Sequence, residues 1–456
     1  MRSQQQELSF SKEALEIEAE QTNSKNVLLW GFGSAISGIF RQGLLSITFV
    51  TLGIFLGMQE GFTFFWSFVA LTIVLGISNL LVIIIGPFIG ALSDSLGKRK
   101  SFMIIFSGIS VVLLATIATW LNFWLTATLF IFGNCAYQLG RIVYDAQVLF
   151  NSATKDRGKT FGISGVFDSA ASLIAVVISL VILFIFGSFS NLSDVQSGLI
   201  AASELNFGGL RWMFPICAGL MLLFLVPYFF SKDKEKGPQD SKPNNGSKKK
   251  TIKKAIKESI SELKDSFYGI VNDKNMILFL IGWFFISTGI AIITVYILDI
   301  TKRITLIEDW QALMVLATIA IAALISSYIT GIFIGEIGPK IAFIFNIANV
   351  ILGMVLSTVA NYKRVIIITE VFPSGLIVKT IKIFYVDWWV IYIGTFFIGL
   401  AIGGFWVIGK QFLIEIAPPR KVGQYFGFKE FITQLGAVFA PLLFFGLISR
   451  LNDKWS

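Results

Sequence analysis

Polar and charged side chains recur at helical spacing inside a stretch of sequence that is otherwise apolar. Asn134, Gln138, Arg141 and Asp145 follow one another at intervals of four, three and four residues, which places them on one face of a helix. Arg141 and Asp145 are one helical turn apart, close enough to form an ion pair. Such a stripe combines hydrogen-bond donors, acceptors and a fixed positive charge. It predicts one wall of a cavity that binds a polar ligand.

A second buried arginine has the same kind of setting. Arg41 lies near the centre of the apolar segment 27–57, and Ser34, Ser37, Arg41 and Thr48 follow at intervals of three, four and seven residues. These intervals place the four residues on one helix face. We therefore expect Arg41 to contribute to the same polar site.

Three further ionisable residues lie about two helical turns inside apolar segments. They are Asp168, with Ser164 and Ser172 on its face, and the neighbours Lys429 and Glu430, with Thr433 and Gln434 one turn on. Three interpretations remain open for them: ligand contact, snorkelling of the side chain to the membrane surface, and an ion pair between the halves that closes a gate. Four aromatic residues can either line the cavity or pack against helices and lipid: Trp283, Trp406, Tyr137 and Tyr144.

The composition excludes most enzymatic chemistry. The chain has no histidine, so histidine metal sites and Ser-His-Asp hydrolysis are excluded. Its two cysteines, Cys135 and Cys217, lie in apolar segments and provide neither a disulfide framework nor a metal cluster. No P-loop or dinucleotide-binding fingerprint occurs. We expect no enzyme, no cofactor and no ATP-driven step.

Membrane helices must position these residues. Of the 456 residues 55% are hydrophobic and 14% are charged, against roughly 25% charged in soluble domains. Spans of about 20 residues each then account for about eleven transmembrane helices. The apolar segments are 27–57, 62–92, 101–121, 124–150, 160–187, 210–230, 275–299, 310–335, 340–360, 386–415 and 421–449.

The polar regions divide the chain. Residues 1–26 form an N-terminal tail and residues 231–273 a Lys-rich linker, with an amphipathic surface helix expected at 251–268. They separate a six-helix half, 27–230, from a five-helix half, 274–456. Basic residues in the loops after the second and fourth segments and in the linker predict a cytoplasmic N-terminus. The net charge of +9 thus reflects topology, and we expect no nucleic-acid partner.

The two halves repeat two motifs. The spacing from Gly90 to Gly97 recurs from Gly331 to Gly338, and the Gly-x-x-Phe-Gly motif that ends at Gly162 recurs at 423–427. Aligning the second pair of motifs places Asp145 opposite Lys410. Opposite charges at equivalent positions can meet across a cavity or close a gate.

The first motif, Gly90-x-x-x-Asp94-x-x-Gly97-Lys98-Arg99-Lys100, resembles the loop signature of the major facilitator superfamily. The resemblance implies twelve helices in two halves, so the last helix is missing in the predicted six-plus-five arrangement. Asp94 can lie near a helix N-terminus and act in gating. The second copy of the motif has Gly335 in place of this aspartate.

Shorter stretches resemble the autophagy-related vacuolar effluxer branch of that superfamily. They are Gly403-Gly404-Phe405, 416–421, 425–428, Tyr144-Asp145-Ala146 and 158–165. Asp145 replaces an asparagine of the branch motif, and Trp30-Gly31-Phe32-Gly33-Ser34 replaces its usual Tyr-Asp start. The branch has many bacterial members, so the resemblance implies amino-acid efflux across a bacterial cytoplasmic membrane.

Together these features predict a secondary transporter with alternating access. The buried basic residues outnumber the acidic ones, which favours a substrate with a carboxylate, an amino acid or an organic anion. Protons are the expected coupling ion, carried by Asp145 or Asp168. We expect a monomer surrounded by lipid. Two alternatives remain: a lipid or lipophilic-drug transporter of the same fold, and a membrane receptor or scaffold that does not transport. The expected binding or coupling residues are Arg41, Asn134, Gln138, Arg141, Asp145 and Lys410; the expected gating residues are Asp94, Asp168, Lys429 and Glu430.

Overall fold

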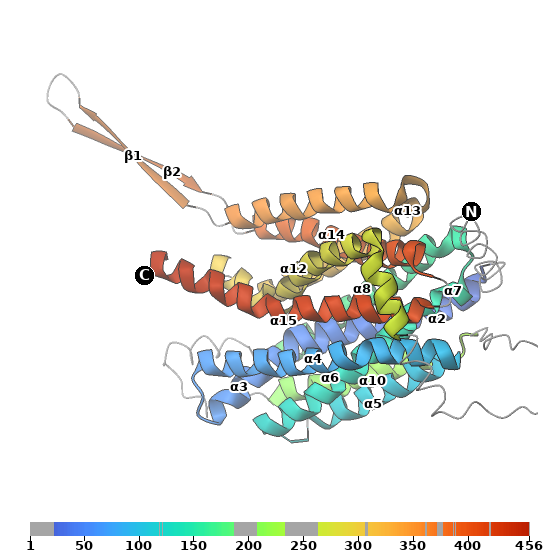
Figure 1. Ribbon diagram of the computed structural model, residues 1–456. Coiled ribbons are helices and arrows are strands. Elements are labelled where there is room, and N and C mark those ends of the chain that lie inside the picture. The colour runs from blue at the N-terminus through green and yellow to red at the C-terminus, as the bar shows by residue number, and fades with distance from the viewer. Residues whose placement is uncertain are drawn as a thin grey trace, which may run out of the picture.

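The protein is a bundle of long helices (Figure 1). The computed structural model describes residues 22–117, 119–120, 122–186, 208–232, 263–305, 309–360, 363–371, 377–385, 387, 389–418 and 421–455. Most of the predicted tail and linker, including 251–262 of the expected surface helix, lies outside the described residues; residues 263–272 are helical.

The helices of the first half follow the predicted apolar segments. One continuous span comprises α2 (Ser24–Gly38), a π-helix η1 (Ile39–Phe49) and α3 (Val50–Gln59). The others are α4 (Phe64–Leu96), α5 (Arg99–Ile117), α6 (Phe123–Ala146), α8 (Arg157–Phe186) and α10 (Gly208–Phe229), with two short turns, α7 (Val148–Asn151) and η2 (Thr154–Asp156), between α6 and α8.

The second half contains α12 (Lys274–Thr305), α13 (Asp309–Val359), α14 (Val390–Ile416) and α15 (Val422–Trp455). Within α13, Gly338 has a φ of 76° and precedes Pro339. Because a left-handed glycine followed by proline interrupts a helix, α13 is two helices in sequence, as the segments 310–335 and 340–360 predict. The predicted helical membrane bundle is confirmed. Eight of the described helices are long and apolar enough to cross a membrane, and the count of eleven spans stays a prediction.

A β-hairpin between α13 and α14 was not predicted. Strands β1 (Lys363–Val371) and β2 (Ile377–Tyr385) pair antiparallel, with Lys363 opposite Tyr385 and Val371 opposite Ile377. From the sequence, the region between the apolar segments 340–360 and 386–415 is expected to be a loop on the outer side of the membrane. The hairpin projects away from the helices at the end of the bundle where α15 also ends (Figure 1). We call this the far end and the opposite end, where α2 begins, the near end.

Connections of the first half gather at the near end. Asn26 at the start of α2 donates to the side chain of Asn151 (2.7 Å) and to the carbonyl of Lys232 (2.8 Å). Lys100 donates to the carbonyl of Ser231 (2.5 Å). The loops that the basic residues assign to one side of the membrane therefore do lie together.

Glycines bring the two halves into backbone contact at the near end. A Cβ on Gly162 of α8 would lie 2.8 Å from the Cα of Gly331 in α13, and a Cβ on Gly427 of α15 would lie 2.8 Å from the Cα of Pro87 in α4. Separations below 3.0 Å are not tolerated, so only glycine allows these helices to approach so closely. The repeated Gly-x-x-Phe-Gly motifs thus contribute one close contact each, and together they close the near end.

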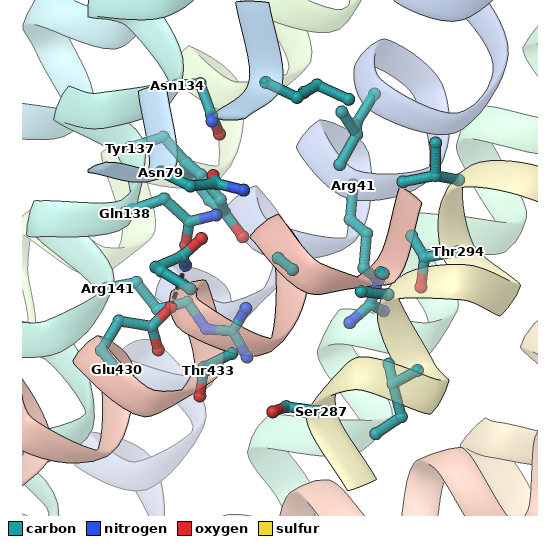
Figure 2. A pocket seen from close by; sticks show the side chains of 18 of the residues that line it. Arg41, Asn79, Asn134, Tyr137, Gln138, Arg141, Ser287, Thr294, Glu430 and Thr433 are labelled. Atoms are coloured by element: carbon teal, nitrogen blue, oxygen red, sulfur yellow. Dashed lines mark hydrogen bonds between the residues drawn. The ribbon is translucent and has the colours of Figure 1, made fainter. Parts of the chain in front are cut away.

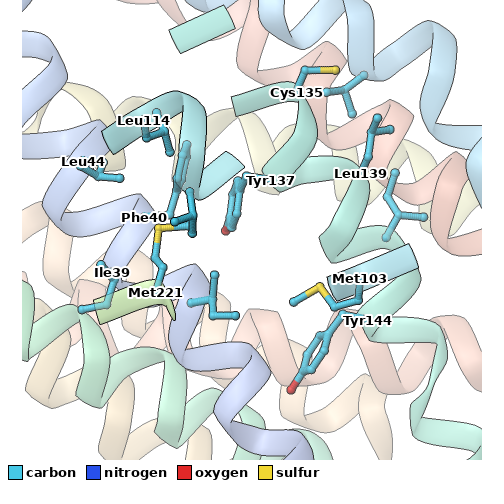
Figure 3. Packing of buried hydrophobic residues seen from close by; sticks show 14 of the residues in the cluster. Ile39, Phe40, Leu44, Met103, Leu114, Cys135, Tyr137, Leu139, Tyr144 and Met221 are labelled. Carbon is cyan, nitrogen blue, oxygen red and sulfur yellow. The ribbon is translucent and has the colours of Figure 1, made fainter. Parts of the chain in front are cut away.

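Buried aromatic rings hold the helices of the first half in register. Phe40 stacks on Tyr137 with ring centroids 3.9 Å apart (Figure 3). Trp30 stacks on Tyr144 at 4.6 Å, and the Tyr144 hydroxyl donates to the carbonyl of Trp30 (3.0 Å). These contacts tie the start of the first span to α6 and fix the direction in which the polar face of α6 points.

Candidate substrate-binding site

A central cavity of about 110 Å³ lies between the two halves (Figure 2). On the same measure one water molecule needs on the order of 10–15 Å³, so the cavity accommodates a small solute. Helices η1, α4 and α6 of the first half and α12, α14 and α15 of the second contribute to its wall. Its polar and aromatic lining residues include Arg41, Asn79, Asn134, Tyr137, Gln138, Arg141, Ser287, Thr294, Trp406, Glu430, Thr433 and Gln434.

The predicted stripe on α6 forms part of this wall. Asn134, Gln138 and Arg141 all line the cavity, as their spacing predicts. Asn134 donates to the Ser78 hydroxyl of α4 (2.8 Å), while its amide oxygen and that of Gln138 are buried without a hydrogen-bond partner in the described part of the chain. Buried polar atoms without partners are costly, and here they lie where a polar solute can satisfy them.

Arg41 is held by an ion pair within the first half. Its Nη2 lies 2.9 Å from Oδ2 of Asp168 on α8 and 3.4 Å from the Ser172 hydroxyl. Asp168, with Ser172, thus orients Arg41 and does not join the two halves. Arg41 still lines the cavity, but its charge is balanced.

The predicted face that combines Arg41 with Thr48 is wrong. Residues 39–49 form a π-helix, whose hydrogen bonds run from residue i to i+5. The wider turn rotates Thr48 away: it is fully buried and donates to the Gly43 carbonyl (2.5 Å). Ser34 and Ser37, which precede the π-helix, line a separate small cavity.

Arg141 does not pair with Asp145, contrary to the prediction. Its guanidinium lies over the ring of Trp406 on α14, 4.3 Å from the ring centroid, and in the described part of the chain no carboxylate lies within ion-pair distance of it. The Cβ atoms of Arg141 and Asp145 are one helical turn apart and therefore close. The long arginine side chain nevertheless packs against the Trp406 ring of the opposite half. The guanidinium edge remains directed into the cavity with Gln138 and Glu430 nearby (Figure 2).

Asp145 pairs instead with Lys410 of α14. Oδ1 of Asp145 and Nζ of Lys410 are 2.8 Å apart, and both side chains are buried. The pair borders a second cavity of about 10 Å³, which shares Arg141 and Trp406 with the central one. Opposite charges at equivalent positions of the two halves therefore meet, on the near-end side of the central cavity.

Breaking this pair is expected to destabilise the protein. Asp145→Ala leaves Lys410 buried without a counter-ion, which typically costs about 3–5 kcal/mol. The double variant Asp145→Ala/Lys410→Met removes both charges and should recover most of this loss. Thermal unfolding in detergent measures the loss of stability in the single variant and its recovery in the double variant. Equal melting temperatures for the single variant and the wild type would contradict a buried Asp145–Lys410 ion pair.

The gating candidates Lys429 and Glu430 lie in different surroundings. Glu430 lines the cavity and accepts a hydrogen bond from Gln434 one turn on. Lys429 is 2% exposed, with its Nζ 4.3 Å from the ring centroid of Trp283 and 5.5 Å from that of Trp406. Trp283 also donates from its indole nitrogen to the Thr433 hydroxyl (2.8 Å). The tryptophans are therefore part of the site and do not face lipid.

Asp94 lies at the near-end contact between the halves. It pairs with Arg99 and accepts a hydrogen bond from the backbone nitrogen of Gln424 (3.0 Å), in the first turn of α15. A carboxylate at a helix N-terminus is stabilised by the backbone N–H groups that point at it. The expectation that Asp94 lies near a helix N-terminus is correct, and the helix belongs to the other half.

Sequence reasoning missed three polar lining residues: Asn79 of α4 and Ser287 and Thr294 of α12. Asn79 is a polar amide inside the apolar segment 62–92, and this position could have predicted that it lines the cavity. Ser287 and Thr294 are small hydroxyl residues of a kind common in membrane helices, so their position gives no such signal. Among the described residues, no cluster of acidic or cysteine side chains has the geometry of a metal site.

Comparison with known proteins identifies related sequences and folds. The sequence model described as "Major Facilitator Superfamily" matches residues 30–378, and the one described as "Sugar (and other) transporter" matches residues 307–456. A search of curated proteins finds no match. The human organic anion transporter MFSD10 has a similar structure, with a TM-score of 0.60, 13% identity and coverage of 92% of each chain.

A second similar structure is the proton:xylose symporter XylE, bound to 6-bromo-6-deoxy-D-glucose. Its TM-score is 0.64 at 14% identity, over 94% of this chain and 89% of that one. Identities this low establish the shared fold alone.

Proposed function

The chain belongs to the major facilitator superfamily, a family of transporters and not of enzymes, and on this premise we propose that it moves a small polar carboxylate-bearing solute by alternating access. The solute is an amino acid or an organic anion. The observation that carries this proposal is Arg141, a guanidinium in the cavity wall with no ion-pair partner among the described residues. A guanidinium fork binds a carboxylate through two parallel hydrogen bonds.

The charges around the cavity support the same substrate class. Arg41 is neutralised by Asp168 and Lys410 by Asp145. Arg141 and Glu430 line the cavity near each other (Figure 2) but not at ion-pair distance. A solute carboxylate fits beside Arg141, and the ammonium group of a zwitterion would have Glu430 as its partner. The unpartnered amide oxygens of Asn134 and Gln138 would accept further hydrogen bonds.

The lining combines polar and apolar side chains. Leu45, Leu75, Val295, Ala437 and Ala440 border the cavity together with the polar residues named above. An amphipathic solute, which has a charged group and a small apolar group, matches this mixed lining.

Alternating access would operate through the near end. The glycine contacts between α8 and α13 and between α15 and α4 close this end. The Asp145–Lys410 ion pair also joins the two halves. Opening would require these contacts to separate while the opposite end closes. We place the near end in the cytoplasm of a bacterial cell, as the basic loops predict, with efflux as the direction.

Proton coupling forms part of the proposal, but the carboxylates expected to carry the proton are engaged. Protonation of Asp145 or Asp168 would break an existing ion pair. A carrier that takes up and releases a proton without dismantling the site therefore has to be sought among the other buried ionisable residues.

A thermal-shift screen with matched compounds tests the substrate class. Purified full-length protein is heated with L-leucine and L-leucinamide, succinate and succinamide, xylose, and a lysolipid. We expect the acids to raise the melting temperature and their amides not to do so. Equal shifts for acid and amide would contradict carboxylate recognition, and a shift with the lysolipid alone would favour the lipid transporter.

Deleting residues 238–248 addresses the remaining alternative. A receptor or scaffold that acts through the Lys-rich linker would lose its function, whereas a transporter should retain flux and the response to acids. Flux is measured in proteoliposomes that contain the deleted protein and, in parallel, the full-length protein.

A further inference from the structure

Lys429 differs from the other buried lysine of the site, Lys410. It is 2% exposed, and in the described part of the chain no carboxylate lies within ion-pair distance of its Nζ. Lys410, the other buried lysine, has Asp145 at 2.8 Å. Lys429 has aromatic partners instead, with the ring centroids of Trp283 and Trp406 at 4.3 and 5.5 Å.

Trp406 joins Lys429 to the cavity. The same indole that lies 5.5 Å from the Lys429 nitrogen lies 4.3 Å from the Arg141 guanidinium. One tryptophan therefore contacts two cations from opposite halves. A ring can stabilise a cation over its face, but two positive charges on one ring repel each other. A change in the net charge at Arg141, such as the binding of an anion, therefore changes the electrostatic free energy of protonated Lys429.

The strongest electrostatic effects on Lys429 come from four charged side chains. Glu430 lies on the same helix, Asp145 and Arg141 come from α6, and Lys410 comes from α14. Two of them attract the lysine and two repel it, and the charge of Asp145 is already balanced by Lys410. Glu430 is left as the one carboxylate shared by Arg141 and Lys429. The group therefore has one positive charge in excess when both cations are charged.

We propose that Lys429 carries the coupling proton, being neutral when the cavity holds no anion and protonated when a carboxylate is bound at Arg141. This inference rests on the proposed function and names the group through which that function is coupled. In the step the amine takes a proton from solution, Lys–NH₂ + H⁺ → Lys–NH₃⁺, and no bond of the solute changes. The negative charge of a bound organic anion balances the added positive charge, whereas a zwitterion adds no net charge.

Thermodynamic linkage gives the consequence. If a bound carboxylate favours protonated Lys429, then protonated Lys429 favours a bound carboxylate by the same factor. Proton and solute therefore bind together and leave together, so that efflux is driven by the outward gradient of the solute and carries a proton out with it. Neither the Arg41–Asp168 pair nor the Asp145–Lys410 pair has to break for the proton to move.

The test uses the tryptophans beside the lysine as reporters. A charge that appears 4.3 Å from Trp283 changes its fluorescence, and because the chain has no histidine, few ordinary groups titrate between about pH 6 and 9. Wild-type protein without solute should show a one-proton fluorescence transition in this interval. Lys429→Arg, which keeps a permanent charge, should abolish it, and Trp283→Phe should diminish it.

Lys410→Arg is the matched control, because it alters a buried lysine that already has a carboxylate partner. It should keep the transition. A wild-type protein without a transition in this interval, or a Lys429→Arg variant that retains it, would overturn the proposal. The titration needs no solute, so it decides on Lys429 even if every acid in the screen fails and the proposed function fails with it.

Coupling to the solute is measured in the same titration. Succinate, which brings net negative charge, should move the wild-type transition to higher pH, while succinamide should leave it in place. Lys429→Gln should bind that acid roughly tenfold more weakly. A transition that the acid does not move would show that the proton on Lys429 is not coupled to binding.

Discussion

Replacing Arg141 with alanine should weaken binding of carboxylate-bearing solutes roughly hundredfold and reduce their transport accordingly. This is the loss expected when one partner of a charge-assisted, desolvated hydrogen-bonded pair is removed. We expect the largest loss of affinity at Arg141, because its guanidinium lines the cavity and no described carboxylate neutralises it. Titration of purified variants with the acids of the screen measures the affinity, and proteoliposomes measure the flux.

Two further substitutions separate geometry from charge. Arg141→Lys keeps the positive charge but loses the fork that binds both carboxylate oxygens, so we expect an intermediate affinity. Arg41→Ala should mainly lower stability, because it leaves Asp168 buried without its partner. If Arg41→Ala abolished binding while Arg141→Ala did not, the carboxylate subsite would be assigned to the wrong arginine.

Gly162→Val should reduce transport roughly 10- to 100-fold without unfolding the protein. A Cβ at this position would lie 2.8 Å from the Gly331 Cα and 2.9 Å from the Ser327 carbonyl oxygen, so α8 and α13 would have to move apart. Overpacking of this kind costs about 1–3 kcal/mol. The cost falls on the conformation in which the near end is closed, and the equilibrium between the two conformations shifts by a corresponding factor.

Hydrogen exchange reports this shift directly. Backbone amides near residues 158–165 and 327–334 should exchange faster in the variant. Gly108→Val is the matched control, since no atom lies within 4 Å of a Cβ built at Gly108 of α5, and it should transport as the wild type does. Normal transport by Gly162→Val would mean that the near end does not need this close contact.

The helical spacing of polar residues explains which parts of the site could be predicted from the sequence. The spacing of Asn134, Gln138 and Arg141 is a property of one regular helix, so their common face could be derived without any neighbour. The same reasoning failed for Thr48, because residues 39–49 form a π-helix. Nothing in the spacing of side chains there reveals the extra residue per turn.

The internal repeat predicted more than periodicity did. It placed Asp145 opposite Lys410, and the two side chains form an ion pair. A repeat relates two segments in space through the pseudo-symmetry of the fold, which gives long-range information that single helices lack. Asp94 is a similar case, since its motif predicted a helix N-terminus but not that the helix would be α15.

The sequence by itself determined that this is a helical membrane protein of two related halves with buried charges, because apolar length, helical spacing and repeats are properties of the chain alone. Only the tertiary structure decided the partners: Asp168 for Arg41, Lys410 for Asp145, and Trp406 shared by Arg141 and Lys429. The reason is that several partners lie within reach of each long side chain. Which one it meets depends on how closely the helices approach, and contacts such as Gly162 against Gly331 fix that approach.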